Sequence, residues 1–210
     1  MASVRAVPPG PTKAANSRPE LPLSSEPISI SDAGTRGSST AKLALIIFSD
    51  FQCPFSRRFA LDTLPDLERD YVATGRLLLA FKHLPIEKIH PRALRAAEAV
   101  ECARREGRFW EMHDHLFADP GNLADAFAQN AATLGLSDGF TLCLNGASKF
   151  KVQAEVADAA RYGITATPGF LIGQIRGAFV KPLKRLSGAL PLSEFRAALD
   201  QGFAAVVGSN

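Results

Sequence analysis

The sequence predicts an α/β protein with its sheet in one layer, because short apolar runs alternate along the chain with helical patterns. Three runs are strand-like: LALIIF at 43–48, RLLLAFKHL at 76–84 and GFLIG at 169–173. Helical patterns follow the first two runs, and another, LSEFRAALDQGFAAV, lies near the end of the chain. This order favours a central sheet flanked by helices.

Each element follows from its local pattern. The run 43–48 is apolar throughout, as in a strand buried on both faces. The next segment predicts a helix that ends at Gly75, since its apolar residues recur at helical spacing. These residues are Phe55, Phe59, Leu64, Leu67 and Tyr71. A second strand covers 76–84, helices fill about 91–162, and short strands are expected in 174–188 after the strand at 169–173.

The first 40 residues differ in composition from the rest of the chain. Six of the fourteen prolines fall within the first 27 residues, and Ser, Gly and Thr crowd the stretch before residue 41. Such a segment buries too little apolar surface to offset its ordering entropy. We therefore expect a flexible N-terminal arm over 1–40, with room for one edge strand near 27–31. A single domain is expected over 41–210, with a helical insertion at about 91–162.

Composition and charge exclude several classes of protein. The chain is 46% hydrophobic and 21% charged, as is typical of a soluble globular protein. Lys and Arg total 24 against 21 Asp and Glu, so the net charge of +3 is too small to indicate nucleic acid or an anionic membrane as a partner. No apolar run approaches the ~18 residues of a membrane span. The N-terminus lacks the ~7–15-residue apolar stretch of a secretory signal, so either the protein stays in the cytoplasm or its signal lies upstream.

Cys53 is the residue that most clearly indicates chemistry. It follows a buried strand and precedes Pro54 and a helical pattern, and proline suits the first position of a helix. This order predicts Cys53 as the helix cap, with its sulfur facing the free N–H groups of Phe55 and Ser56. Those donors and the helix dipole favour a thiolate, which is the nucleophile in disulfide exchange. From spacing alone, a small buried hydrophobic residue is an equal alternative.

Several segments of the chain resemble the DsbA-like thiol-disulfide oxidoreductases. FSDFQCPFSRRFALDTLPDLERDYVATG is similar to their active-site segment, which usually reads FSDFQCPYC. The resemblance continues in the same order through HLPIEKIHPRALRAAEAVECA, GRFWEMHDHLF, VADAARYGITATPGFLIG and LSGALPLSEFRAALD, and it covers roughly residues 25–200. It implies a thioredoxin-like fold with a helical insertion, a central sheet flanked by helices, and activity in disulfide exchange.

The resemblance also implies an active site. Thr167 and Pro168 are similar to the family's proline loop, in which the proline is cis and faces the cysteine. The residue before that proline offers backbone groups to an extended peptide; the alternative is a proline that merely leads a strand. The residues expected to be catalytic are Cys53, Ser56 and Pro168, and those expected to bind substrate are Pro54, Phe55 and Thr167.

The chain departs from the family at two positions. The family's second cysteine is Ser56 here, and a serine hydroxyl cannot form a disulfide, so Cys53 is expected to act alone. The Ser56 hydroxyl can still donate a hydrogen bond to the Cys53 thiolate. The family's buried carboxylate, six residues before the cysteine, is Ile47 here. Because a buried acid is costly without a function, this second loss fits the first and favours a natural variant over an engineered Cys-to-Ser substitution.

Cys102 and Cys143 lie in the helical insertion. Some members of the family join two insertion cysteines, and closing a loop of about 41 residues would stabilise the fold by roughly 4 kcal/mol in the loop-entropy model. Two reduced thiols are the equal alternative, because the sequence does not settle the compartment.

The histidines do not indicate a metal site. His113 and His115 are two residues apart, so on a helix they point about 200° apart and cannot share an ion. His83 and His90 flank the loop after the second strand and are expected to be turn residues, with a position near the active face as the alternative. Phe109 and Trp110 are expected in the core. We therefore expect neither a metal nor a resident cofactor.

The resemblance and the two departures together predict a monothiol oxidoreductase or isomerase. Cys53 would attack a disulfide, and an external thiol would resolve the adduct, so autonomous dithiol oxidation is not expected. The expected partners are protein or peptide thiols and disulfides, with glutathione or another small thiol as co-substrate.

Two other functions compete with this one. The first is a redox-inactive, peptide-binding or chaperone-like module. The second is an iron–sulfur site, since Cys-Pro-Phe-Ser is superficially similar to the Cys-Gly-Phe-Ser of monothiol glutaredoxins, but the surrounding sequence disfavours it. The family is usually exported, which favours the periplasm over the cytoplasm; the sequence predicts no oligomeric state.

Overall fold

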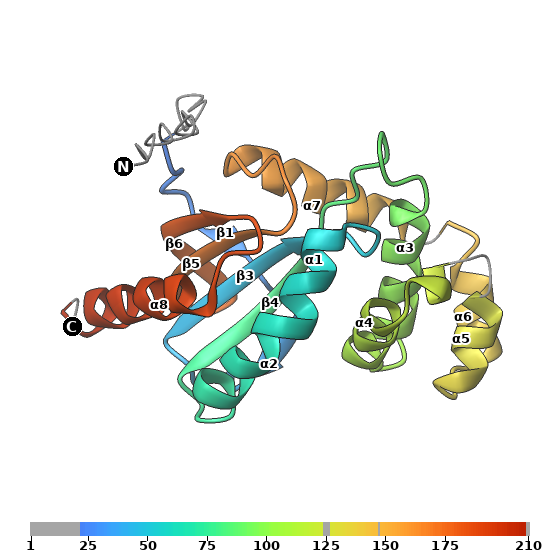
Figure 1. Cartoon of the computed structure of the whole chain (residues 1–210), viewed down its shortest axis with the longest axis horizontal. Helices are drawn as coiled ribbons and strands as arrows, with labels where there is room; N and C mark the ends of the chain where they lie inside the picture. Colours follow the sequence, from blue (N-terminus) through green and yellow to red (C-terminus); the bar gives the residue numbers. More distant parts are fainter. Residues whose placement is uncertain (1–21, 124–126, 147, 209–210) are drawn as a thin grey trace, which may run out of the picture.

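A six-stranded sheet lies at the centre of the protein, with the strand order β1-β6-β5-β3-β4-β2 (Figure 1). The structure, a computed structural model, describes residues 22–123, 127–146 and 148–208. The strands are β1 (Ile28–Ser29), β2 (Gly34–Gly37), β3 (Leu43–Ser49), β4 (Leu77–His83), β5 (Gly169–Arg176) and β6 (Phe179–Ser187). Among these described strands, β3 and β4 are parallel to each other and the other neighbouring strands are antiparallel.

The two central strands confirm the prediction of buried strands. All seven residues of β3 and all seven of β4 are buried. β3 pairs with β4 on one side and with β5 on the other, so its backbone is fully bonded. The loop after β3 therefore begins from a rigid strand end.

The N-terminal segment corrects the predicted domain boundary. The edge strand expected near 27–31 is present as β1, which pairs with β6 at one edge of the sheet, whereas β2, which was not expected, pairs with β4 at the other. Ile28 and Ile30 are buried, which supplies the apolar surface that the composition of the arm does not suggest. The sequence of β2, GTRG, has no apolar period and gave no signal. Residues 1–21 of the arm lie outside the described residues.

One helical run follows β3 and consists of α1 (Pro54–Arg58), η1 (Phe59–Thr63), α2 (Leu64–Leu67) and η2 (Glu68–Val72). η1 and η2 are wider π-helical turns. Pro65 lies at the start of α2, where its missing N–H interrupts the regular hydrogen-bond ladder. The run thus stays continuous, as the periodicity predicts, but is not a regular α-helix throughout.

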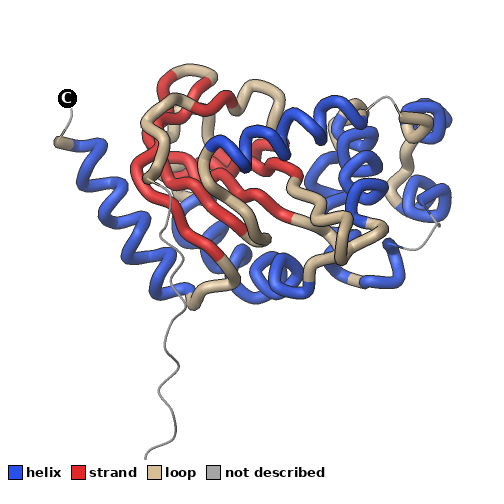
Figure 2. Tube along the Cα trace, turned by 90° about the horizontal axis from the view of Figure 1, so that it is seen from above, coloured by secondary structure: helices blue, strands red, loops and turns tan. Residues whose placement is uncertain are grey.

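The predicted helical insertion is also confirmed. Its elements are α3 (Ala93–Arg104), α4 (Phe109–Ala118), η3 (Pro120–Leu123), α5 (Phe127–Thr133), α6 (Asp138–Cys143) and α7 (Lys149–Arg161). Helices α3 to α6 gather at one end of the sheet, and the C-terminal helix α8 (Leu192–Val207) lies at the other end (Figures 1 and 2).

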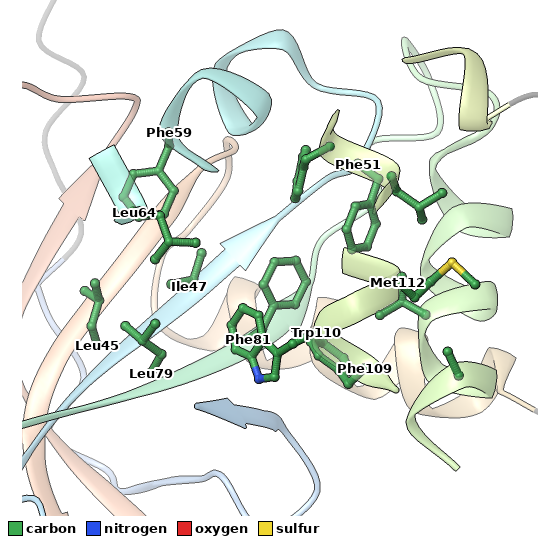
Figure 3. Close-up of a cluster of buried hydrophobic side chains, with 14 of the residues drawn as sticks. Leu45, Ile47, Phe51, Phe59, Leu64, Leu79, Phe81, Phe109, Trp110 and Met112 are labelled. Carbon is green, nitrogen blue, oxygen red and sulfur yellow. The ribbon is translucent and has the colours of Figure 1, made fainter. Parts of the chain in front are cut away.

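The two faces of the sheet carry separate hydrophobic clusters. The larger cluster joins alternate residues of β3 and β4 to the helical run 54–72, the insertion and α8. In Figure 3, Phe59 and Leu64 lie near Ile47 on one side, and Phe109, Trp110 and Met112 lie near Phe81 on the other. The smaller cluster covers the opposite face and includes Ala159 of α7 and Tyr162 at the C-terminal end of that helix. The sheet is therefore enclosed on both faces, and the core position expected for Phe109 and Trp110 is confirmed.

Within the part of the chain that the structure describes, no helix is long and apolar enough to span a bilayer.

Candidate active site

Cys53 lies at the junction between the sheet and the first helix. It is the N-cap residue of α1, with extended backbone angles (φ −73°, ψ 122°), and Pro54 begins the helix. The turn is closed by hydrogen bonds from Cys53 N–H to Asp50 O (3.1 Å) and from Arg57 N–H to Cys53 O (3.0 Å). The residue is only 4% exposed. The rigid end of β3 therefore holds the thiol in a fixed position.

The sulfur does not point where the sequence predicts. No hydrogen bond joins the Cys53 side chain to the N–H groups of α1. Instead, Sγ lies 3.3 Å from the carbonyl oxygen of Thr167, with the thiol as donor. The carbonyl of the facing loop therefore takes the place of the helix N–H groups as the hydrogen-bond partner of the sulfur.

The loop from α7 to β5 supplies the facing wall of the site. The Thr167–Pro168 peptide bond is cis, and Pro168 is buried. Pro168 O accepts a hydrogen bond from Gly188 N–H at 2.7 Å, which ties the loop to the end of β6. The hydroxyl Oγ1 of Thr167 is buried and has no hydrogen-bond partner among the described residues. Two loops distant in sequence thus meet at the Cys53 sulfur.

The Ser56 side chain is fully buried in the first turn of α1. Its Oγ accepts a hydrogen bond from Asp50 N–H at 3.4 Å. The hydrogen bond expected between Ser56 and Cys53 Sγ is not formed in the structure, because the hydroxyl faces the strand end instead. Pro54 and Phe55, the other residues of this turn, are exposed, and Phe55 is 59% exposed despite its apolar ring.

Asp50 organises the loops around Cys53 through its side chain. Its Oδ1 accepts a hydrogen bond from Gln52 N–H (2.8 Å), and Oδ2 accepts from Ile86 N–H (2.8 Å) and pairs with His90 Nδ1 (2.8 Å). The carboxylate is fully buried. It therefore ties the turn before Cys53 to the loop after β4, a link that no local pattern in the sequence reveals.

A pocket of about 350 Å³ opens beside Cys53. Its lining residues are Phe51, Gln52, Cys53, Pro54, Arg57, Arg92, Leu116, Pro120 and Leu123. Most of the lining is apolar, and among the described residues its charged side chains are two arginines. The sequence did not single out Arg92, since its place beside Cys53 depends on the packing of the loop after β4.

A buried ionic network lies between β4, α3 and α7. His83 Nε2 pairs with Glu101 Oε1 (3.1 Å), and His83 N–H donates to Glu155 Oε2 (2.8 Å). His83 is therefore buried in the core rather than in a turn. Burial acts to raise the pKa of Glu101, but the hydrogen bond and charge of His83, with Lys151 and Arg104, outweigh it and hold this pKa at about 2.

Within the described residues, this network is the only group of side chains whose ligand atoms are close enough together to hold a metal ion. Ligand atoms of His83, Glu101 and Glu155 lie within 4.8 Å of one another. However, Lys151 pairs with Glu155 at 2.6 Å, and Arg104 pairs with Glu101 at 2.7 Å. The carboxylates are thus already neutralised by cations that would repel a metal ion, so the donor set does not fit one.

The remaining cysteines form a disulfide between α3 and α6. Cys102 and Cys143 are bonded, with a Cα–Cα distance of 5.7 Å. Of the two alternatives left open by the sequence, the structure has the bonded pair. Since the chain has three cysteines, Cys53 is its single free thiol.

His113 and His115 have separate partners, as their spacing predicts. His113 Nδ1 pairs with Asp114 (2.7 Å), and His115 Nε2 contacts Asn130 Oδ1 (3.0 Å). His113 is completely buried among aromatic rings, and this burial lowers its pKa.

Comparison with known proteins bears on the fold and the family. The family model described as thioredoxin matches residues 31–200. Curated relatives include the Na(+)/H(+) antiporter NhaA 3 of Salinispora tropica, 32% identical over 168 residues, which cover 78% of this chain and 25% of that protein. Another is NhaA 1 of Mycolicibacterium gilvum, 41% identical over 90 residues, which cover 42% of this chain and 14% of that protein. The chain spans about a quarter or less of the length of these relatives.

Solved structures share the fold. Wolbachia pipientis alpha-DsbA1 has a TM-score of 0.70 and 23% identity, covering 83% of this chain and 92% of that chain. Oxidised BdbD from Bacillus subtilis has a TM-score of 0.65 and 19% identity, covering 86% and 97%. Pseudomonas aeruginosa DsbA2 has a TM-score of 0.61 and 22% identity, covering 84% and 95%. The expected thioredoxin-like fold with a central sheet flanked by helices is confirmed.

Proposed function

The chain belongs to the thioredoxin family, and from this premise we propose that it carries out thiol-disulfide exchange through a single nucleophile, Cys53. In the first step, the Cys53 thiolate attacks one sulfur of a substrate disulfide. An Sγ–S bond forms, the substrate S–S bond breaks, and the second substrate sulfur leaves as a thiolate that takes up a proton.

An external thiol completes the cycle, because Ser56 cannot attack the mixed disulfide. One small thiol displaces the substrate sulfur and forms a mixed disulfide with Cys53. A second small thiol attacks this mixed disulfide, releases a small disulfide and regenerates the Cys53 thiolate. Over the cycle, two electrons pass from two small thiols to one substrate disulfide. Glutathione or a similar small thiol is the proposed co-substrate.

The observation that carries this proposal is the position of the Cys53 sulfur. It lies 3.3 Å from the carbonyl of Thr167, next to a pocket, and Cys102 and Cys143 are already bonded to each other. A thiol kept for packing alone would not need an adjacent pocket. The buried, unpartnered hydroxyl of Thr167 beside it also supports an incomplete binding site, since buried polar groups are normally satisfied.

The surroundings of Cys53 support an extended peptide as the disulfide substrate. Phe55 and Pro54 expose apolar surface next to the thiol. Thr167 lies on the facing loop, from which backbone groups can pair with a substrate strand. The disulfide between Cys102 and Cys143 supports an oxidising compartment, and therefore an exported location.

Turnover of a disulfide-bonded peptide with excess small thiol tests the proposal. We expect the wild type to accelerate reduction or isomerisation of the peptide and Cys53→Ala to abolish the acceleration. Ser56→Ala is the matched control, because it removes a neighbouring hydroxyl without removing the nucleophile, and it should retain most of the activity.

The same variants test the runner-up function, a redox-inactive peptide-binding module, which the exposed ring of Phe55 favours. If Cys53→Ala prevents aggregation of an unfolded protein as well as the wild type does, and neither protein turns over the peptide disulfide, the peptide-binding function is correct and the enzymatic one is wrong.

A further inference from the structure

We infer that the pocket beside Cys53 is a recognition site for a low-molecular-weight disulfide that carries carboxylate groups, with Arg57 and Arg92 as its anion-binding side chains. The inference rests on the proposed reactivity of Cys53 and names one substrate of that site. It assigns a charge preference to this small disulfide, which neither the fold nor the proposed reaction requires.

The size and lining of the pocket favour a small molecule. Its volume of about 350 Å³ is at the lower end of the range typical of small-ligand sites. Phe51, Leu116 and Leu123 provide apolar walls for the methylene and sulfur groups of such a ligand. Cys53 is itself part of the lining, so a bound disulfide lies within reach of the nucleophile.

The two arginines give the pocket its charge. No Asp or Glu is among the described residues that line it, so the positive charge is not neutralised within the pocket. The guanidinium of Arg92 has no hydrogen bond or ion pair with any described residue, and its side chain is exposed. Guanidinium groups bind carboxylates through paired N–H donors, which explains the preference for a carboxylate over an ammonium or neutral group.

The side chain of Arg57 is held in place before any ligand binds. Arg57 Nε donates to Phe117 O (2.9 Å), and its terminal NH2 group donates to Ala118 O (2.9 Å), at the end of α4. Both acceptors are neutral carbonyls, so no described residue pairs with its charge.

Arg92 is held through its backbone. Its N–H donates to Gln52 Oε1 at 2.8 Å, while Asp50 binds Ile86 N–H and His90 on the same loop. The buried carboxylate of Asp50 therefore links the position of Arg92 to the turn that carries Cys53. Such preorganisation reduces the entropy lost when a ligand binds.

Three symmetrical disulfides of similar size test the inference: 3,3′-dithiodipropionate with carboxylates, cystamine with ammonium groups, and bis(2-hydroxyethyl) disulfide without charge. The rate constant for mixed-disulfide formation at Cys53 is measured by acid quench and intact mass. Each value is divided by the rate constant of the same disulfide with 2-mercaptoethanol, which removes intrinsic differences in reactivity.

We expect the wild type to prefer the carboxylate probe over cystamine, and the preference to shrink as salt is added. Arg92→Gln should reduce it by about two- to fivefold, the range for one solvent-exposed charge pair, and Arg92→Glu should reduce it further. Arg58→Gln is the matched control, because Arg58 is exposed on the same turn of α1 but does not line the pocket. Its preference should equal that of the wild type.

The possible failures are distinguishable. If the wild type reacts with the neutral probe but shows no charge preference, or if Arg92→Gln and Arg58→Gln behave alike, the recognition site is wrong and the proposed function stands. If an acidic cysteine peptide, but not the small probe, shows the Arg92-dependent preference, the small-molecule assignment is overturned.

If no probe reacts, the proposed function fails, and binding is then tested without chemistry. Saturation-transfer NMR of dithiodipropionate with Cys53→Ala should show contact that Arg92→Glu in the same background removes. The absence of contact with Cys53→Ala itself would overturn the site.

Discussion

Ser56 distinguishes this site from one with two cysteines. Its hydroxyl is buried and accepts a hydrogen bond from Asp50 N–H at 3.4 Å, so the residue is fixed at the start of α1. It lies three residues after Cys53, a spacing that places two side chains on the same face of a helix. A thiol at this position would therefore lie near Cys53.

Replacing Ser56→Cys should convert the site from a one-thiol to a two-thiol mechanism. We expect mixed disulfides to accumulate on wild-type Cys53, because in the proposed mechanism only an external thiol removes them, whereas the new cysteine should displace them and form an internal disulfide. Intact mass after reaction with a small disulfide measures the difference. Ser56→Ala should hold the adduct as the wild type does, and an equally stable adduct on Ser56→Cys would contradict this account.

At the same scale, the sequence predicted which residues meet but not their hydrogen bonds. Cys53 and Thr167 are 114 residues apart, and their contact followed from the family resemblance rather than from any local pattern. The links from Asp50 to Ile86 and His90, and the place of Arg92 beside Cys53, depend on loop packing. No periodic signal encodes such contacts, so they were not predicted.

Among the elements, the strand β2 shows how tightly the edge of the sheet is packed. Gly34 in this strand has no room for a side chain, since a Cβ there would lie 2.3 Å from the ring of Phe109. Phe109 is itself buried against Phe81 and Trp110, so its ring has little freedom to move. The glycine is therefore a packing requirement.

Gly34→Val should lower the free energy of unfolding by about 1–3 kcal/mol, as expected for overpacking a buried contact. Thr35→Val, at the next and exposed position of the strand, should change it by less than about 0.5 kcal/mol. Urea unfolding followed by circular dichroism measures both variants. Equal stability of the Gly34 variant and the wild type would show that the ring yields easily.

The disulfide between α3 and α6 should contribute to the stability of the insertion. Replacing both Cys102→Ala and Cys143→Ala opens a loop of 41 residues, and we expect the free energy of unfolding to fall by about 2–4 kcal/mol. Mixed-disulfide formation at Cys53 should not change, because neither cysteine lines its pocket. An unchanged urea midpoint would contradict the stabilising role, and a large change in Cys53 reactivity would contradict its independence.

Strands β3 and β2 show why some elements were predictable from the sequence and others were not. β3 is apolar throughout because both of its faces are buried, and such a run is visible in the sequence. β2 is held by backbone pairing with β4 and by the space that Gly34 leaves for Phe109, neither of which produces an apolar pattern. The edge strand expected near 27–31 is therefore present as β1, whereas the strand β2 at 34–37 was not predicted.

For the molecule as a whole, the buried ionic network makes stability depend on pH. It joins β4, α3 and α7 through His83, Glu101, Glu155 and Lys151. The pKa of Glu101 is about 2 in the folded protein, against an ordinary value of 4.5. A carboxyl whose pKa is lower in the folded state stabilises the fold above its unfolded value, and this stabilisation is lost as the pH falls through the folded value.

We therefore expect the free energy of unfolding to fall by on the order of 3 kcal/mol between pH 4.5 and pH 2 through Glu101. His113 adds a loss that begins at higher pH: its pKa is lowered by burial, so the unfolded chain takes up the proton first as the pH drops below about 6.5. Urea unfolding as a function of pH measures both effects. Glu101→Gln should flatten the lower part of the profile and keep the upper part; an unchanged lower part would show that Glu101 is not its cause.

The central claim is that Cys53 alone forms and releases mixed disulfides. Intact mass spectrometry tests it most directly: the protein is treated with a peptide disulfide, measured, treated with a small thiol and measured again. We predict one peptide adduct per chain, located at Cys53, absent from Cys53→Ala and removed by the thiol, with the Cys102–Cys143 disulfide intact throughout. An unmodified Cys53, or an adduct found instead on Cys102 or Cys143, would contradict the account.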